Sequence, residues 1–132
     1  MLSNQKTRVL VVDDDAAMAK FLSSYLTRRN FDSSTASSGE EAIRMFRVYD
    51  PVLVLLDVSM PGMNGLEVAA RLRDAGSTAA VVFLTVHDDE DIILAAKAAG
   101  AIGYVVKSRL FFDLMLAVQE ARACRPFLSP IL

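Results

Sequence analysis

The sequence predicts an α/β fold, a doubly wound parallel sheet of five strands, and three observations lead to this prediction. Five short apolar or β-branched runs alternate with five stretches of helical periodicity. Each return to a parallel neighbour requires a crossover connection, and the helical stretches supply it. Polar side chains also follow the ends of several strands, which is where open α/β sheets bind their ligands.

The first two strand–helix units occupy the amino-terminal part of the chain. Residues 8–12 form a β-branched run, and residues 32–36 form a weaker strand of the same length. Ser38 and Glu41 have the spacing of a capping box at the start of the second helix. The apolar positions repeat at intervals of three and four in both helices: Met18, Phe21, Leu22, Tyr25 and Leu26 in the first, and Ala42, Met45, Phe46 and Tyr49 in the second.

Three further units complete the pattern. Residues 52–56 are an uninterrupted apolar strand of the kind that is covered on both faces. Residues 80–85 and 104–106 predict the fourth and fifth strands, and Pro126 prevents the last helix from continuing past it. The periodic apolar positions of the last three helices are Leu66, Ala69 and Leu72, then Ile92, Ile93 and Ala96, then Leu114, Ala117, Val118 and Ala121. The arrangement predicts a flavodoxin-like (βα)5 sheet with strand order 2-1-3-4-5.

Composition limits the classes of function. A chain of 132 residues with 53% hydrophobic residues fits one domain with an ample core. The net charge of -2 argues against direct nucleic-acid contact by this domain. The longest apolar runs are far shorter than the roughly 20 residues that cross a bilayer, so we expect no membrane association. Cys124 is the only cysteine and the first residues are polar, which favours a reducing cytoplasm.

The polar residues at the strand ends belong together chemically. Asp13 and Asp14 follow the first strand, Asp57 the third, Thr85 ends the fourth, and Lys107 follows the fifth. Neighbouring carboxylates repel unless a hard cation accepts their oxygens, which predicts Mg²⁺ (or Mn²⁺). A lysine and a hydroxyl suit the oxygens of a phosphoryl group. Asp57 stands among apolar residues and is the expected nucleophile, giving an aspartyl phosphate.

The residues at these strand ends carry a resemblance to a known family. The chain resembles the receiver domain of two-component response regulators over nearly its whole length. The matching stretches are VLVVDDD at 9–15, LLDVSMPGMNG at 55–65, FLT at 83–85 and GYVVK at 103–107. Each stretch is weak by itself, but their order and spacing together are highly specific.

The resemblance implies a role for each matching residue. Asp57 would accept a phosphoryl group from a sensor histidine kinase, with Thr85 and Lys107 holding the phosphoryl oxygens. Tyr104 matches the aromatic position that turns inward when the threonine moves toward the phosphate, and the surface around the fourth helix and fifth strand would then change. The implied metal ligands are Asp14, Asp57, the backbone carbonyl of Ser59 and, through a water molecule, Asp13.

The resemblance also suggests an output. Ser108 follows Lys107 where many receivers have proline, so either the loop after Lys107 is looser or Ser108 caps the last helix. The ending RPFLSPIL resembles receivers that precede a LuxR-type helix-turn-helix domain. We therefore expect a receiver at residues 1–125 and the start of a linker at residues 126–132, leading to an output domain that would contact DNA. Phosphorylation could also pair two copies of the domain, and a receiver that acts alone through protein contacts is an alternative.

Several residues have a plainer interpretation or support another function. Asp15 is expected to cap the following helix rather than to bind metal. His87, with Ser59, could tune the lifetime of the phosphorylated state. Asp13 and Asp15 form the Asp-x-Asp pair of a haloacid-dehalogenase-type phosphatase with Asp13 as nucleophile, although Asp57 would then have no role. A flavodoxin-like electron carrier would place a flavin phosphate near Asp13–Asp15, where three aspartates would repel it. The favoured function is not that of an ordinary enzyme, because the domain would catalyse only its own phosphorylation and dephosphorylation.

Overall fold

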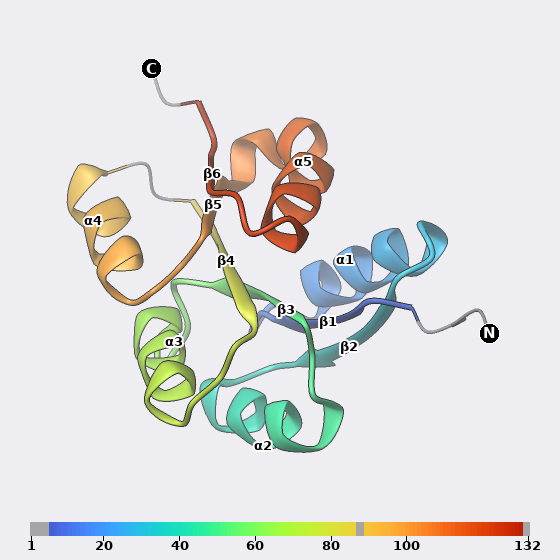
Figure 1. The fold of residues 1–132 in the computed structure, drawn as a ribbon, viewed down its shortest axis with the longest axis horizontal. Helices are drawn as coiled ribbons and strands as arrows, with labels where there is room; N and C mark the ends of the chain where they lie inside the picture. The colour runs from blue at the N-terminus through green and yellow to red at the C-terminus, as the bar shows by residue number, and fades with distance from the viewer. Residues whose placement is uncertain (1–5, 87–88, 131–132) are drawn as a thin grey trace.

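The computed structural model describes residues 6–86 and 89–130, which form a parallel sheet with the strand order β2-β1-β3-β4-β5-β6 (Figure 1). The predicted order of the first five strands is confirmed. A short sixth strand is added beside β5. The elements are β1 Arg8–Val12, α1 Ala16–Arg28, β2 Asp32–Ala36, α2 Gly39–Tyr49, β3 Leu53–Asp57, α3 Gly65–Asp74, β4 Ala80–Thr85, α4 Glu90–Ala98, β5 Gly103–Val106, the 3-10 turn η1 Lys107–Arg109, α5 Leu110–Arg122 and β6 Phe127–Leu128.

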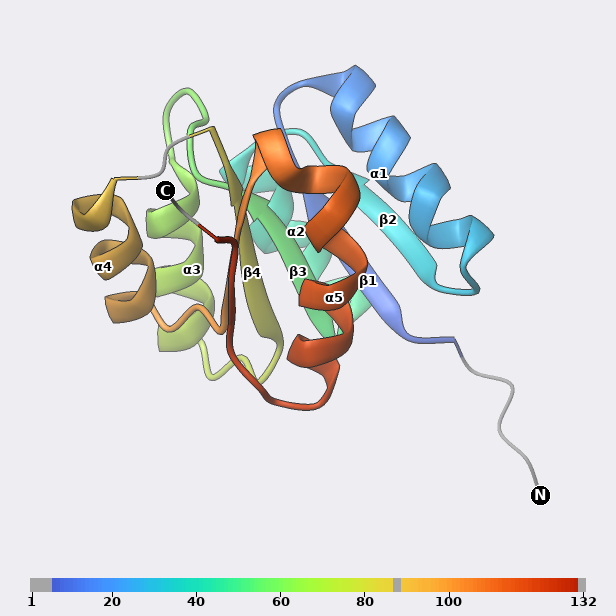
Figure 2. The same cartoon turned by 90° about the horizontal axis from the view of Figure 1, so that it is seen from above.

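Helices cover both faces of the sheet, as Figures 1 and 2 show. Helices α1 and α5 pack on one face, and α2, α3 and α4 pack on the other. Side chains alternate between the faces along each strand, so Val9 and Val11 join the cluster with α1 and α5, whereas Leu10 and Val12 join the other cluster. This double burial is the reason that the sequences of the inner strands β1, β3 and β4 are almost continuously apolar.

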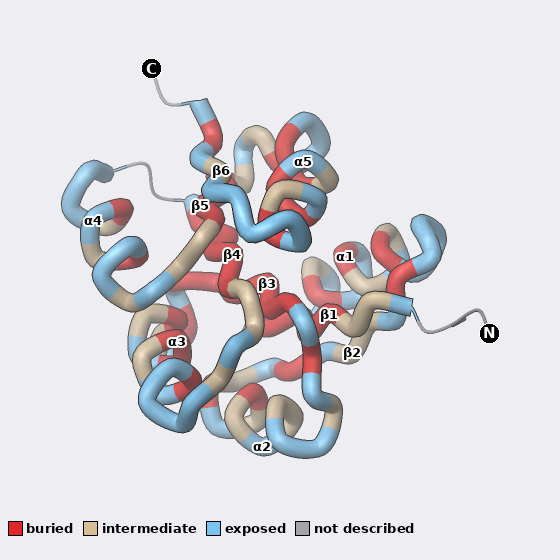
Figure 3. The backbone as a smooth tube through the Cα atoms, in the orientation of Figure 1, coloured by how far each residue is buried: buried red, intermediate tan, exposed pale blue. Residues whose placement is uncertain are grey.

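Strand β3 shows most clearly how a strand is buried when helices cover both faces of the sheet. All five of its residues are buried, and the red core of Figure 3 runs along it. Asp57 is the last residue of this strand and its only polar one. The strand therefore carries a carboxylate to the edge of the core without exposing it freely to water.

The weakly predicted strand β2 lies at one edge of the sheet. Only Ala36 of its five residues is buried, and a polar edge strand resists pairing with other chains. The Ser33 hydroxyl bonds the Ser23 hydroxyl of α1 at 2.6 Å. The polar sequence of β2 is consistent with the position of this strand at the edge of the sheet.

Side chains cap helices α1, α2 and α3, and the sequence predicts the first two of these caps. Asp15 accepts hydrogen bonds from the backbone N–H groups of Ala17 and Met18, so its capping role is confirmed. Ser38 accepts from the Glu41 N–H, but the Glu41 carboxylate accepts from the Ser37 N–H rather than completing the box on Ser38. The suggested cap by Ser108 is wrong, because no side chain caps η1 or α5.

Strand β6 lies within the segment expected to begin a linker. Phe127 and Leu128 pair in parallel with Gly103 and Tyr104 of β5. Among the described residues, no helix is both long enough and apolar enough to span a membrane.

Candidate functional site

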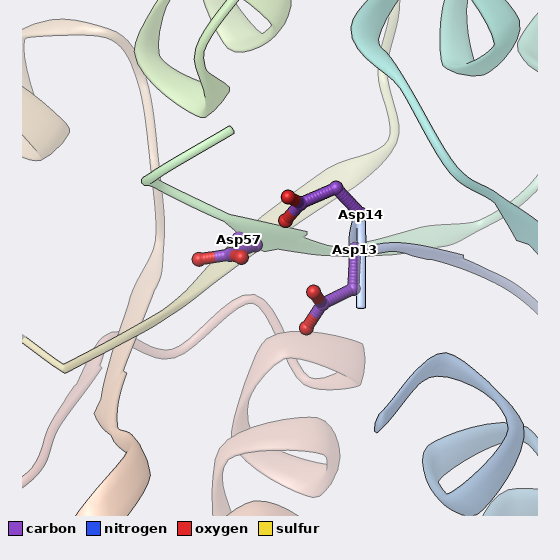
Figure 4. A group of neighbouring side chains, drawn as sticks. All are labelled: Asp13, Asp14 and Asp57. Atoms are coloured by element: carbon purple, nitrogen blue, oxygen red, sulfur yellow. The ribbon is translucent and has the colours of Figure 1, made fainter. Parts of the chain in front are cut away.

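The candidate site lies at the carboxyl edge of the sheet. Val12 pairs with Leu56, so Asp13 follows β1 beside the point where Asp57 ends β3. Thr85 pairs with Val106, which brings the end of β4 next to Lys107. Figure 4 shows Asp13, Asp14 and Asp57 at the neighbouring ends of β1 and β3, where their carboxylates lie close together. The structure thus brings together residues that are up to 94 positions apart in the chain.

Asp13 is buried and fully engaged. One carboxylate oxygen accepts the backbone N–H of Asp15 at 2.9 Å, and the other lies 3.2 Å from the Lys107 Nζ. Its own N–H donates to the carbonyl of Ala36 at the end of β2. A buried carboxylate is tolerated when it is paired and hydrogen-bonded in this way.

Asp57 shares the same lysine. Its Oδ2 lies 3.5 Å from the Lys107 Nζ, and its Oδ1 accepts the Ser59 N–H at 3.2 Å. Burial raises the pKa of Asp57 to about 6, the negative charge of Asp13 adds to this rise, and Lys107 and the Ser59 N–H oppose it. The Lys107 ammonium therefore offsets only part of the cost of ionising Asp57 in the folded protein.

The donor set fits a divalent cation. One carboxylate oxygen each from Asp13, Asp14 and Asp57 lie within 4.8 Å of one another. Three carboxylates facing one ammonium leave an excess of two negative charges, which one divalent ion would balance. Oxygen donors of this kind are those that Mg²⁺ prefers. The exposed position of Asp14 leaves the cluster open to solvent and to a substrate.

Gly65, at the start of α3, packs closely against the end of β3. The sequence pattern did not predict this role. The Gly65 N–H donates to the carbonyl of Val58 at 2.9 Å, so the start of α3 lies against the end of β3. A Cβ atom at this position would overlap the carbonyl oxygen of Asp57. The glycine of the motif at 55–65 is thus required by a close backbone approach.

The remaining predicted residues have distinct environments. Thr85 is fully buried at the end of β4, and Tyr104 is buried in β5 against the core on the α4 side. Ser59 is exposed, and its N–H contacts Asp57. His87 lies outside the described residues. Lys107 is the residue that joins Asp13 to Asp57.

The phosphatase alternative loses its second aspartate in this geometry. The carboxylate of Asp15 points to the start of α1 and accepts two backbone N–H groups there. The carboxylates that gather instead are those of Asp13, Asp14 and Asp57. Asp57, which would have no role in the phosphatase chemistry, belongs to this cluster.

A doubly wound sheet with an acid–lysine cluster at its carboxyl edge suits a protein that handles a phosphoryl group. The family comparison specifies the class, because the model for the response regulator receiver domain matches residues 9–119. The chain belongs to this family and is a receiver domain of a two-component phosphorelay.

Curated relatives extend beyond the length of this chain. The nitrate/nitrite response regulator NarL of Escherichia coli K12 is 34% identical over 134 residues, covering 99% of this chain and 62% of NarL. The DNA-binding response regulator MtrA of Mycobacterium tuberculosis H37Rv is 38% identical over 106 residues, covering 80% of this chain and 46% of MtrA. The chain therefore spans roughly half to three fifths of these relatives.

Solved structures of receivers superpose well. A LuxR-family response regulator from Aurantimonas sp. SI85-9A1 has a TM-score of 0.89 at 30% identity, with 96% of this chain and 91% of that chain covered. The response regulator TrrA of Thermotoga maritima, in complex with Mg²⁺-BeF, has a TM-score of 0.78 at 36% identity, with coverage of 87% and 98%. These likenesses agree with the family assignment and with the sheet.

Proposed function

We propose that Asp57 is the phospho-acceptor of this receiver and that it takes a phosphoryl group from a sensor histidine kinase with Mg²⁺ (or Mn²⁺) bound. The observation that carries the proposal is the shared contact of the Lys107 Nζ with the buried carboxylates of Asp13 and Asp57. The lysine marks the place where added negative charge would be stabilised.

The transfer is a displacement at phosphorus. A carboxylate oxygen of Asp57 forms the new O–P bond while the P–N bond to the kinase histidine breaks, and the released imidazole keeps the bonding pair. The nucleophile must be ionised, and the raised pKa of Asp57 makes that form costly in the metal-free protein. A bound divalent ion would supply positive charge to the carboxylate and to the phosphoryl oxygens.

The other residues at the carboxyl edge hold and report the phosphoryl group. Asp14, Asp57 and the Ser59 carbonyl would bind the metal, with Asp13 acting through water, and Lys107 and Thr85 would contact the phosphoryl oxygens. Tyr104, buried on the neighbouring strand, would report the movement of Thr85. His87 and Ser59 would tune the phosphorylated lifetime, and an unchanged rate of phosphate loss after replacing both by alanine would exclude that role.

The output is proposed to lie beyond residue 125, where the linker would begin. NarL is named a response regulator and MtrA a DNA-binding one, which supports a helix-turn-helix output domain that reaches DNA without contact by the receiver itself. Phosphorylation could also form a homodimer, and a receiver acting alone is the alternative. The exposed Cys124 fits a reducing cytoplasm.

Intact-mass spectrometry after incubation with acetyl phosphate tests the proposal. We expect the wild type to gain one phosphoryl group with Mg²⁺ and none after chelation, and Asp57→Asn to gain none. The Asp13→Asn variant should show slower uptake that still requires Asp57. Uptake retained in Asp57→Asn but lost in Asp13→Asn would instead identify the phosphatase chemistry.

A further inference from the structure

The segment after α5 returns to the sheet and lies along the outer edge of β5. We call residues 127–129 the C-terminal strap. The Phe127 N–H donates to the carbonyl of Ile102 at 3.0 Å, and the Ser129 N–H donates to the carbonyl of Tyr104 at 2.9 Å. Figures 1 and 2 show β6 running beside β5 on the side away from β4. The strap thus covers the strand edge that would otherwise be open.

A buried polar cluster fastens the end of the strap. Ser129 is completely buried, and its hydroxyl donates to the Asp113 Oδ2 at 2.7 Å while accepting the Val106 N–H at 3.1 Å. Asp113, in α5, is 3% exposed and is paired with the Arg109 Nε at 2.9 Å. We call Ser129, Asp113 and Arg109 the clasp. Every polar group in it is satisfied, which makes removal of one member costly.

The clasp is hydrogen-bonded to the residue next to the candidate site, because the Ser129 hydroxyl accepts the Val106 N–H. Val106 directly precedes Lys107, and Val106 also pairs with Thr85 across the sheet. Lys107 in turn contacts Asp13 at 3.2 Å and Asp57 at 3.5 Å. The Ser129 hydroxyl therefore holds the backbone from which the phosphoryl-binding lysine projects.

We propose that Ser129 and Asp113 are positioning residues for Lys107, and that docking of the C-terminal strap is linked to phosphoryl binding at Asp57. This inference rests on the proposed function. When the clasp is closed, the end of β5 is fixed from its outer edge and Lys107 stays within reach of Asp57. When it opens, the Val106 N–H loses its partner and the end of β5 gains freedom, so the grip on phosphoryl oxygens weakens.

The coupling is reciprocal. A ligand that binds the closed arrangement more tightly must stabilise the closed arrangement by the same factor. Phosphoryl binding should therefore tighten the strap. The strap lies within the expected linker at residues 126–132. The clasp would therefore connect the phosphorylated site to the linker through hydrogen bonds.

The first experiment compares uptake of phosphoryl groups from acetyl phosphate by variants. Ser129→Ala should raise the concentration for half-maximal rate by about 5-fold or more, the lower end of typical coupling. Ser129→Thr, which keeps the hydroxyl, should take up phosphoryl groups with a half-maximal concentration close to that of the wild type. The matched control is Ser33→Ala, which removes hydroxyl hydrogen bonds at the opposite edge of the sheet and should leave phosphoryl uptake unchanged. An equal response of Ser129→Ala and Ser33→Ala would overturn the inference.

A second experiment uses the unaltered protein. Hydrogen exchange with and without Mg²⁺ and beryllofluoride should show slower exchange of the Phe127, Ser129 and Val106 amides in the bound state. Unchanged exchange at these three amides, with beryllofluoride bound, would contradict the linkage while leaving the proposed function intact. Failure of the wild type to take up any phosphoryl group would instead refute the proposed function, and the inference with it.

Discussion

Ionisation of buried Asp57 costs free energy in the metal-free protein, so the stability of the fold should depend on pH. The folded pKa of Asp57, about 6, lies above the ordinary value of 3.8. Above pH 6 the carboxylate is ionised in both states, so the folded state bears the full penalty. As the pH falls from 6 toward 3.8, the folded state takes up the proton first, and this group's contribution to stability rises.

The Asp57→Asn variant tests this sign. With a chelator at about pH 7.5 it should be more stable than wild type by about 1 to 3 kcal/mol, because the buried charge is gone. The difference should shrink as the pH approaches about 4, where the wild type is protonated. Urea unfolding at the two pH values measures it. A stability difference that does not vary with pH would show that the Asp57 pKa is not raised.

Gly65 gives a second prediction for a single residue. Gly65→Ala should lower stability by about 2 kcal/mol or more and reduce phosphoryl uptake, because its Cβ would collide with the Asp57 carbonyl. Gly76→Ala is the control, since that position has a φ of 85° but open space around it. It should cost about 1 kcal/mol from backbone strain and leave uptake unchanged. Equal uptake in both variants would argue against the close approach.

Asp15 caps helix α1, whereas its neighbour Asp14 is proposed to bind the metal. Asp15→Ala should lower stability by about 1 kcal/mol, because it removes the cap of α1, without changing Mg²⁺ affinity. Asp14→Ala should weaken Mg²⁺ binding and leave stability without metal nearly unchanged. Urea unfolding and isothermal titration with Mg²⁺ measure the two effects. A loss of Mg²⁺ affinity in Asp15→Ala would place Asp15 in the metal site.

Element-level patterns in the sequence predict the fold well where a strand is buried on both sides. The run at 52–56 indicates β3, because only a covered strand is apolar almost throughout, and the structure places the strand one residue later, at Leu53–Asp57. The edge strands give weaker signals, since β2 is mostly polar and β6 has only two residues. Glu41 also bonds Ser37 instead of Ser38, a choice between adjacent N–H groups that spacing alone cannot make.

The candidate site is predictable to the extent that it follows from strand ends. Asp13, Asp57 and Lys107 meet because their strands end at one edge, which the order 2-1-3-4-5 already implies. The roles of Gly65 and Ser129 could not be predicted in the same way. One depends on a backbone collision and the other on a buried bond to Asp113, and neither leaves a periodic signal.

Metal binding should stabilise the whole molecule. A ligand that binds only the folded state adds about 2.7 kcal/mol at a concentration one hundred times its dissociation constant. We therefore expect Mg²⁺ to raise the unfolding temperature of the wild type and to have a much smaller effect on Asp14→Asn, measured by calorimetry. Addition of a chelator should reverse the rise. An equal rise in both proteins would mean that the ion binds elsewhere.

The most direct test of the account locates the phosphoryl group on the chain. Protein phosphorylated with acetyl phosphate and Mg²⁺ is treated with borohydride, which reduces an acyl phosphate to an alcohol, and its peptides are mapped by mass spectrometry. We expect a reduced side chain at position 57 and an unmodified one at position 13. Reduction at Asp13, or at neither aspartate despite an increase in intact mass, would contradict it.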